Sequence, residues 1–394
     1  MQQFDYLVIG GGLAGAEALA GIREVDPHGR IGLLSAERYR PYDRPPLSKA
    51  LWKEGAEENA IWRSIPEDVE VLLGRRAVTL DLMRHEVRDD GAATYRFGKL
   101  LLATGGTPRT LTRASDRVIY FRTLDDYRRL REATRQPRRV VVVGGGFIGT
   151  ELAAALQWSG NEVTMLVPEQ GLAARQFAPD LSAWLVEFYR VKGVNVRLNQ
   201  SAAEVTSRGR CVTIRTTGGD ELVADVAVAG LGIVPNAGIA GAAGLEVENG
   251  IVVDEWLRTA HPDVYAAGDV ASFPSPALGR RMRVEHEDNA RTQGRVAGRN
   301  MAGHRARYDH MPFFYSDLYE LGYEAVGELD ARHQIVADWK QPFREGVLYY
   351  LSEERVRGVL LWNTWGQVDA ARTLIAESGP VALEGLKRRL PEAT

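Results

Sequence analysis

A glycine-rich turn between a short apolar strand and a helix occurs twice in this chain. The first copy, Gly10–Gly15, follows the apolar run Phe4–Ile9, and the second, Gly144–Gly149, follows Arg139–Val143. Each copy has glycines at its first, third and sixth positions and runs into an alanine- and leucine-rich stretch that predicts a helix. In this motif the first glycine permits a tight turn, the second lets the backbone approach a pyrophosphate, and the third lets strand and helix pack closely.

Two copies of this turn, each between a strand and a helix, predict two dinucleotide sites. The N-terminus of the following helix offers N–H groups and a partial positive charge to the phosphates. A purely structural glycine turn is the alternative for either copy taken alone. Together the two copies suggest a flavin dinucleotide at one and a nicotinamide dinucleotide at the other.

Size and charge limit the remaining classes of function. The 394 residues are enough for two or three domains, each with its own core. The formal charge of −3 gives no general electrostatic argument for nucleic acid or for an anionic membrane, so we expect neither as a partner. Arginines cluster at Arg280, Arg281 and Arg283, and again between Arg128 and Arg139. A solvated charged face and a docking site for an acidic redox protein are both compatible with these clusters.

The chain has one cysteine, Cys211, so an intrachain disulfide and a redox-active cysteine pair are excluded. We expect a packed, inert thiol there and no metal site. The first strand begins at Phe4, which leaves no room for a leader peptide, and no apolar run reaches the roughly 18 residues that a spanning helix needs. We therefore expect a cytoplasmic protein without a membrane span, as a monomer or homodimer.

An acidic residue follows the second strand of each predicted unit. Glu37 comes after Arg30–Ser35, and Glu169 comes after Glu162–Val167. At this place a carboxylate accepts hydrogen bonds from the ribose hydroxyls, and in the second unit it would repel the 2′-phosphate of NADPH. A surface glutamate is the alternative for Glu37, and Arg175 lies close enough in sequence to receive that phosphate.

A proline-rich cationic segment, Arg40–Lys49, follows the second strand. Its three prolines within six residues exclude a helix and predict a stiff, irregular loop that carries Arg40, Arg44 and Lys49. Such a loop is well placed to cover a diphosphate and a flavin, with an ordinary charged surface loop as the alternative. Later, the segment Val264–Asp269 ends in an aspartate after a buried strand, and the Asp269 carboxylate can hydrogen-bond the ribityl hydroxyls of a flavin.

The order of these segments predicts an α/β fold with two three-layer Rossmann-type dinucleotide-binding domains and a C-terminal α+β domain. We expect a discontinuous FAD-binding domain from residues 1–125 and 251–308. The NAD-binding domain would span 126–250, and the C-terminal domain 309–394.

The sequence resembles the apoptosis-inducing factor-like branch of the FAD-dependent pyridine nucleotide oxidoreductases, which is related to ferredoxin and rubredoxin reductases. The motifs that carry the resemblance are Gly10–Gly15, Arg40–Lys49, Ala103–Gly106, Gly144–Leu152, Tyr265–Asp269, Arg283–Asp288, Ser316–Leu318, Gly322–Gly327 and Val359–Asn363. The resemblance covers essentially the whole chain.

The resemblance implies a set of site residues. Lys49 and Glu151 would form a catalytic pair beside the flavin N5. FAD would contact Gly10, Gly12, Gly15, Glu37, Arg44, Lys49, the backbone near Ala77, Arg122, Asp269, His286 and Glu287. The nicotinamide dinucleotide would contact Gly145, Gly146, Phe147, Ile148, Glu169, Gly232 and Glu285. Tyr315 stands where apoptosis-inducing factors carry a tryptophan near the flavin. Glu287 replaces a histidine of those proteins and a tryptophan of ferredoxin reductases.

The resemblance implies hydride transfer from NAD(P)H, with NADH favoured, to the flavin N5, and then electron transfer to an unidentified acceptor such as a ferredoxin, a quinone or O₂. A dedicated ferredoxin or rubredoxin reductase is one alternative. A slowly turning over, NADH-responsive redox sensor that acts through protein interactions is another.

Overall fold

The computed structural model describes residues 1–390, and the contacts within the chain divide it into two compact units. Unit 1 is formed by residues 1–43, 59–107 and 234–312, and unit 2 by residues 44–58, 108–233 and 313 onward. In this division, the C-terminal part of the chain and the second glycine turn belong to the same unit. The three-domain boundaries expected from the sequence stay a prediction beside it.

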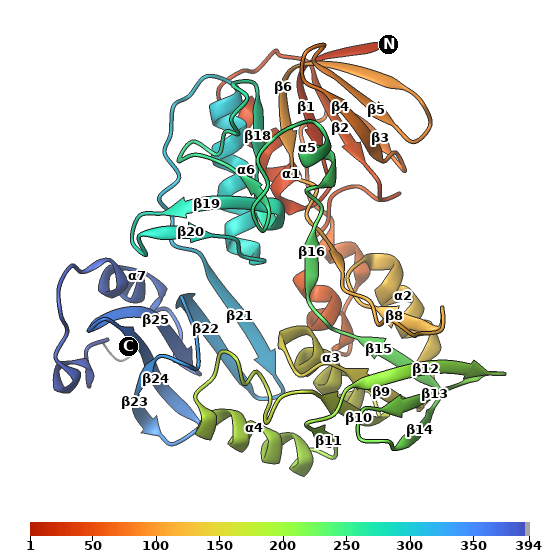
Figure 1. Cartoon of the computed structure of the whole chain (residues 1–394), viewed down its shortest axis with the longest axis vertical. Coiled ribbons are helices and arrows are strands. Elements are labelled where there is room, and N and C mark those ends of the chain that lie inside the picture. Colours follow the sequence, from red (N-terminus) through yellow and green to blue (C-terminus); the bar gives the residue numbers. More distant parts are fainter. Residues whose placement is uncertain (391–394) are drawn as a thin grey trace. The chain divides into compact units, whose positions relative to one another are not determined.

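Unit 1 is built on a mixed sheet, and the first glycine turn follows its strand β1 (Figure 1). Its strands, in spatial order, are β3 (Glu70–Leu73), β2 (Ile31–Ser35), β1 (Gln2–Ile9), β6 (Thr94–Leu102), β5 (Glu86–Asp89) and β4 (Ala77–Asp81), with β18 (Val264–Ala266) also paired to β6. The β3-β2-β1-β6 part and β18 are parallel, and β5 and β4 are antiparallel additions. Parallel strands buried on both faces read as continuous apolar runs, as in β1, where Leu7 and Val8 are fully buried.

Two helices of unit 1, α1 (Leu13–Arg23) and α6 (Glu287–Met301), pack closely on each other because small residues line their contact. A Cβ added to Gly294 would lie 2.3 Å from the Ala14 oxygen, and one on Gly298 would lie 2.2 Å from the Ala18 oxygen. The remaining elements of unit 1 are α5 (Gly238–Ala242), the 3₁₀ turn η4 (Gly268–Val270), and a small sheet of β17 (Ile251–Val252), β19 (Ala271–Ser275) and β20 (Arg280–Met282).

Unit 2 contains a parallel sheet, and the second glycine turn follows one of its strands. Its strands, in spatial order, are β11 (Asn195–Leu198), β10 (Glu162–Val167), β9 (Arg139–Val143), β15 (Val226–Ala229) and β8 (Val118–Tyr120). The helices α2 (Leu124–Ala133), α3 (Phe147–Trp158) and α4 (Pro179–Val191) accompany it, and β12 (Ala202–Arg208), β13 (Cys211–Thr216) and β14 (Glu221–Ala224) form an antiparallel sheet.

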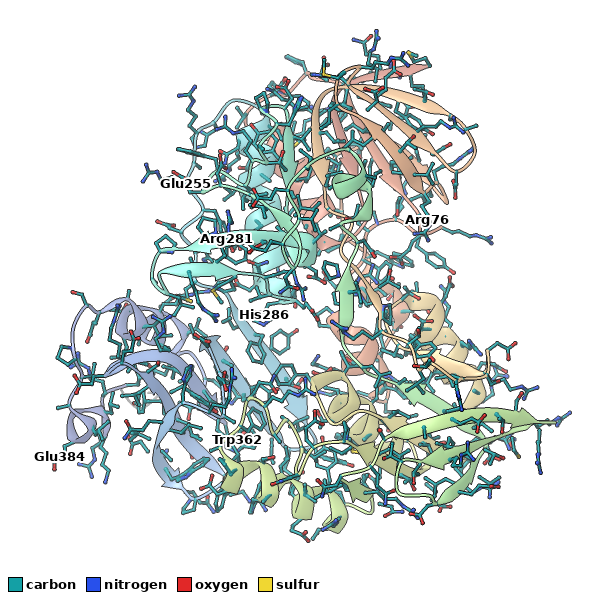
Figure 2. The ribbon with its side chains drawn as sticks, in the orientation of Figure 1. Arg76, Glu255, Arg281, His286, Trp362 and Glu384 are labelled. Atoms are coloured by element: carbon teal, nitrogen blue, oxygen red, sulfur yellow. The ribbon has the colours of Figure 1, made fainter. Side chains whose placement is uncertain are left out.

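The C-terminal part of unit 2 is an antiparallel sheet with one helix. Its strands, in spatial order, are β21 (Phe313–Leu318), β22 (Leu321–Gly327), β25 (Arg355–Trp362), β24 (Glu345–Ser352) and β23 (Gln334–Gln341), and α7 (Val368–Ala376) contacts β22 and β25. Trp362, labelled in Figure 2, is fully buried, with its ring centroid 5.7 Å from that of Tyr323 and 5.6 Å from that of Phe177. Since Phe177 belongs to the segment between β10 and α4, these rings join the C-terminal sheet to the second Rossmann-type domain.

The proline-rich segment differs in part from the sequence prediction. No α-helix forms there, but Pro45–Ser48 is a 3₁₀ turn (η1), followed by a second one, η2 (Ala50–Trp52). The prediction of an irregular loop was wrong here because proline is compatible with the first turn of a helix, whose N–H groups need no partner within the helix. Elsewhere η3 (Glu58–Ile61) and η5 (Leu383–Leu386) are further 3₁₀ turns, and β7 (Gly106–Pro108) and β16 (Ile233–Pro235) lie where the chain passes between the units.

Candidate functional site

In the first glycine turn, two of the three motif glycines are required by packing within the protein and one is not. A Cβ on Gly10 would lie 2.1 Å from the Ala103 oxygen, and one on Gly15 would lie 2.0 Å from the Gly10 oxygen. Packing within the protein therefore requires both glycines. A Cβ on Gly12 would meet no atom of the described residues within 4 Å. Packing does not explain this middle glycine, but a pyrophosphate against the backbone does.

The second turn repeats this pattern. A Cβ on Gly144 would lie 2.4 Å from the Gly230 oxygen, and one on Gly149 would lie 2.1 Å from the Gly144 oxygen. Around Gly146, a Cβ again finds no neighbour within 4 Å among the residues the structure describes. Both helices that follow, α1 and α3, begin after a glycine N-cap, so no N-cap side chain binds the first N–H groups of either helix. The residues present therefore fit a dinucleotide at each turn.

In unit 1, several of the predicted FAD contacts gather where α6 begins. Arg283 donates to the Asp269 backbone oxygen at 3.1 Å and to the Glu285 carboxylate at 3.0 Å. His286 is the N-cap of α6, and Glu287 is the first residue of the helix. The Nδ1 atom of His286 is buried, and this burial lowers the pKa of His286 to about 4, against the opposing charges of Asp269 and Asp288.

The two other predicted FAD contacts of unit 1 are connected through one loop. Glu37 accepts a hydrogen bond of 2.6 Å from the Tyr42 hydroxyl, and its backbone oxygen accepts from Gly74 N–H. Gly74 directly follows β3 and begins the short loop to β4, which starts at Ala77. The ribose and adenine side of the predicted FAD site would therefore be formed by Glu37 and the start of β4.

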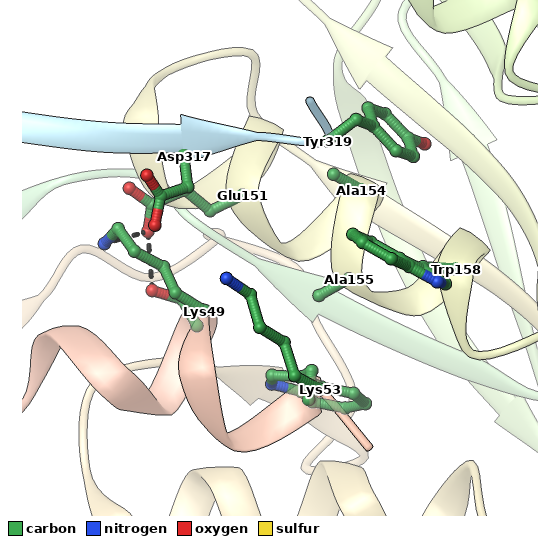
Figure 3. Close-up of a pocket in the computed structure, with 10 residues that line it drawn as sticks. Lys49, Lys53, Glu151, Ala154, Ala155, Trp158, Asp317 and Tyr319 are labelled. Carbon is green, nitrogen blue, oxygen red and sulfur yellow. Dashed lines mark hydrogen bonds and ion pairs between the residues drawn. The ribbon is translucent and has the colours of Figure 1, made fainter. Parts of the chain in front are cut away.

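In unit 2, the predicted catalytic pair is a buried ion pair. The Lys49 Nζ lies 2.8 Å from the Glu151 Oε2, and the exposed fractions of the two side chains are 10% and 3%. Glu151 also accepts hydrogen bonds from the Ser48 hydroxyl at 2.5 Å and from the Ser316 hydroxyl at 2.6 Å. Figure 3 shows Lys49 approaching this carboxylate. Three donors from η1, its C-cap and β21 thus surround one buried carboxylate, as a buried charge requires.

Two buried tyrosines, Tyr189 and Tyr323, interact electrostatically with Glu151. Burial is the main reason that the pKa values of Tyr189 and Tyr323 lie well above the usual tyrosine value, and the negative charge of Glu151 adds to both shifts. Both hydroxyls therefore stay protonated. The Lys49 Nζ also lies 5.5 Å from the ring centroid of Tyr315, within the range of a cation–π contact.

The remaining predicted contacts in unit 2 have defined neighbours. Arg44 donates to the Arg122 backbone oxygen at 3.0 Å, so these two residues are neighbours, and their contact with FAD stays a prediction. Phe147 and Ile148 are the first residues of α3. Glu169 forms an ion pair with Arg175 at 2.7 Å. Gly232 has φ +79° and open space around its Cβ position.

The Arg280–Arg283 cluster is less available for docking than the sequence suggested. Arg281, labelled in Figure 2, donates to the backbone oxygens of Val253 and Ser272. With Arg283 held by Asp269 and Glu285, two of the three arginines bind within unit 1. Among the described residues, one group could hold a metal ion, namely Glu328, Asp330 and His333, but arginines already pair with both of its carboxylates.

The pyridine nucleotide-disulphide oxidoreductase family matches residues 4–294 of the sequence. The chain belongs to this family. A second match, to the mitochondrion-associated C-terminal region of apoptosis-inducing factor, covers residues 297–342 and 334–377. Within residues 1–390, none of the helices is both long and apolar enough to cross a membrane.

Individual relatives cover nearly the full chain. Apoptosis-inducing factor 1 of Dictyostelium discoideum is 34% identical over 95% of this chain and 79% of its own length. The ferredoxin reductase subunit of a 5,5'-dehydrodivanillate O-demethylase from Sphingobium sp. is 35% identical over 96% of this chain and 94% of its own length. A solved covalent complex of putidaredoxin reductase with putidaredoxin gives a TM-score of 0.90 at 30% identity, covering 97% of this chain and 95% of the solved chain.

These similarities show that this chain is an FAD-dependent NAD(P)H oxidoreductase with two Rossmann-type domains and a C-terminal α+β domain. The fold class, the cofactor and the reaction class expected from the sequence are confirmed. The family's name refers to disulphides, but Cys211 is the only cysteine of this chain. Disulphide chemistry within one chain is therefore excluded for this member.

Sequence reasoning gave no role to Ser48 or Ser316, the two hydroxyl donors to Glu151. Both lie in motifs that carried the resemblance, directly beside Lys49 and Asp317. The position of both serines inside these motifs was therefore the signal that could have identified them. Their meeting at Glu151 depends on tertiary packing, because 103 and 165 residues separate them from it along the chain.

Proposed function

We propose that this oxidoreductase binds FAD at the first glycine turn and NADH at the second. The observation that carries the proposal is the buried Lys49–Glu151 pair, which links the proline-rich segment to the helix of the second turn. When bound, FAD accepts the hydride and releases electrons one or two at a time. The Lys49 ammonium would stabilise negative charge that develops during the transfer, and Glu151, Ser48 and Ser316 would hold that ammonium in place.

The preference for NADH rests on Glu169. Its carboxylate follows β10, where it would accept from the ribose 2′-hydroxyl and repel a 2′-phosphate. Arg175, the candidate phosphate ligand, is paired with the same carboxylate. Phe147, Ile148, Gly145, Gly146, Gly232 and Glu285 complete the proposed nucleotide contacts.

We further propose a one-electron carrier of the ferredoxin or rubredoxin class as the acceptor. Relatives at 31 to 35% identity include a putidaredoxin reductase, a ferredoxin reductase subunit and a rubredoxin reductase, each matched over about nine tenths or more of both chains. The protein would act as a monomer or homodimer, and a cytoplasmic location is part of the proposal.

Steady-state assays with several acceptors test this proposal. NADH-dependent reduction of a [2Fe–2S] ferredoxin, followed through cytochrome c, should exceed direct reduction of a quinone or of O₂ at equal concentration. Rates with an acidic carrier should fall as salt is added, because screening weakens charge-steered docking. Rates with ferricyanide serve as the reference for flavin function. Faster turnover with O₂ or quinone than with every carrier would refute this choice of acceptor.

The C-terminal match to apoptosis-inducing factor favours a second candidate, an NADH-responsive interaction protein. In that case reduced flavin with bound nucleotide would persist, and dimerisation or partner binding would change with it. Slow reoxidation in air together with an NADH-dependent change of mass in size-exclusion chromatography would support this candidate. Fast turnover at constant mass would exclude it.

A further inference from the structure

A small open pocket reaches the buried Lys49–Glu151 pair from solvent (Figure 3). Its walls come from η1 and η2, from α3, and from β21 and the residue after it. Glu151, 3% exposed, lines it together with Lys49. Trp158 at the end of α3, 67% exposed, marks its solvent side, and Asp317 and Lys53 also line it.

The size of this pocket decides what it can hold. The cavity volume is about 40 Å³. Sites for organic ligands usually measure about 300–1,000 Å³. One water needs only ~10–15 Å³ of such space and two to four polar partners. The carboxylates of Glu151 and Asp317 and the ammonium of Lys53 supply those partners, so the pocket suits one to a few waters rather than a substrate.

The reaction produces a proton that has to leave. Oxidation of NADH yields NAD⁺, one proton and two electrons, and two one-electron carriers take up the electrons without the proton. One proton per NADH must therefore pass from the reaction site to solvent. Among the described residues, Lys49 is the cationic donor nearest to the buried carboxylate, and the pocket connects it with solvent.

We propose that water in this pocket carries the proton to solvent and that Asp317 is the relay. Lys49 Nζ gives a proton to pocket water and regains one from the reaction side, so its ammonium is restored after each turnover. The water passes the proton to the Asp317 carboxylate, which releases it to bulk solvent. Neither Asp317 nor Lys53 forms an ion pair or side-chain hydrogen bond with the rest of the described chain, so the carboxylate is available for this exchange. The inference rests on the proposed function of Lys49.

Replacing Asp317 by asparagine separates a relay from a structural role. Asp317→Asn keeps the shape but removes the group that holds the proton. In FAD-loaded protein, flavin reduction by NADH should be unchanged, while reoxidation by ferricyanide should slow about tenfold or more. The solvent isotope effect on reoxidation in D₂O should rise, and added formate should restore much of the rate. Glu320→Gln, three residues away and paired with Lys192, is the control and should leave every rate unchanged.

A second variant and a structural readout test the water itself. Ala155→Leu should fill the pocket and slow reoxidation as Asp317→Asn does. A high-resolution crystal structure of the FAD-loaded wild type should show ordered water between Asp317 and Glu151, and that of Ala155→Leu should not. Normal reoxidation and an unchanged isotope effect in both variants, or a dry pocket in the wild type, would overturn the proposal. Failure of NADH to reduce the wild-type flavin would instead overturn the proposed function.

Discussion

Glu151 is a buried carboxylate with three polar partners. Its side chain is 3% exposed, forms an ion pair with Lys49 and accepts hydrogen bonds from Ser48 and Ser316. A buried ion pair gains little stability compared with apolar residues, but removing one partner leaves an uncompensated charge. We infer that the pair is kept for its chemistry, with the two serines limiting the structural cost.

A double-mutant cycle separates the chemistry of this pair from its structural role. Lys49→Met should destabilise the protein by about 3 kcal/mol and slow flavin reduction by NADH about 100-fold, with FAD retained. Adding Glu151→Gln should recover most of the stability, because no lone charge remains, but not the rate. Stopped-flow reduction and urea unfolding measure the two effects. Lys192→Met, at a surface ion pair, is the control, and a rate that recovers together with stability would argue against a catalytic Lys49.

Glu169 gives a second prediction at the scale of a residue. Glu169→Ala removes the carboxylate that would repel the 2′-phosphate and releases Arg175 from its 2.7 Å ion pair. The ratio of kcat/KM for NADPH over NADH should rise about tenfold, equivalent to about 1.4 kcal/mol. Steady-state kinetics with both nucleotides provide the ratio. A ratio equal to that of the wild type would remove Glu169 from the nucleotide site.

At the scale of elements, each of the two strand-turn-helix units is determined mainly by contacts between residues close together in sequence. Their glycine spacing and apolar runs are sufficient to predict β1 with α1 and β9 with α3, because the contacts that require Gly15 and Gly149 lie within the same turn. The 3₁₀ turn at Pro45–Ser48 was not predictable in the same way. Proline fits both an irregular loop and a first helical turn, and packing of the buried Leu47 and Ser48 selects between them.

The middle glycines provide a test of which turn binds which nucleotide. Gly12→Ala and Gly146→Ala both place a methyl group in open space, so each variant should fold with nearly normal stability. The first should lose FAD on gel filtration, and the second should keep FAD but raise the KM for NADH. Gly15→Ala is the contrast, since its Cβ would lie 2.0 Å from the Gly10 oxygen and should impair folding. Loss of FAD from Gly146→Ala but not from Gly12→Ala would reverse the assignment.

At the scale of the whole molecule, each unit owes its site to segments far apart in sequence. Sequence patterns predicted the fold class, which is confirmed. The list of site residues came mostly from the family resemblance and stays a prediction. Sequence patterns did not predict the serines at Glu151, or that Arg281 and Arg283 bind backbone and carboxylate oxygens within unit 1. Such contacts depend on how distant segments pack, which a single sequence does not encode in a readable pattern.

Stability of the whole chain should depend on pH through His286. Its pKa is about 4 in the folded protein, because the ring is buried, and about 6.5 when unfolded. Only the unfolded state takes up this proton between those values, so stability is complete above pH ~6.5 and falls by up to about 3 kcal/mol as pH drops toward 4. Urea unfolding at pH 7.5 and 5.0, with saturating FAD, measures this. His286→Gln should lose less stability than the wild type over that range, and equal losses would contradict the assignment.

Anaerobic mixing of the FAD-loaded protein with NADH tests the central claim most directly. The visible flavin absorption should bleach with about one equivalent of NADH, because one hydride reduces one flavin. NADPH at the same concentration should bleach it more slowly. An absorption spectrum that stays unchanged in a large excess of NADH would contradict the account.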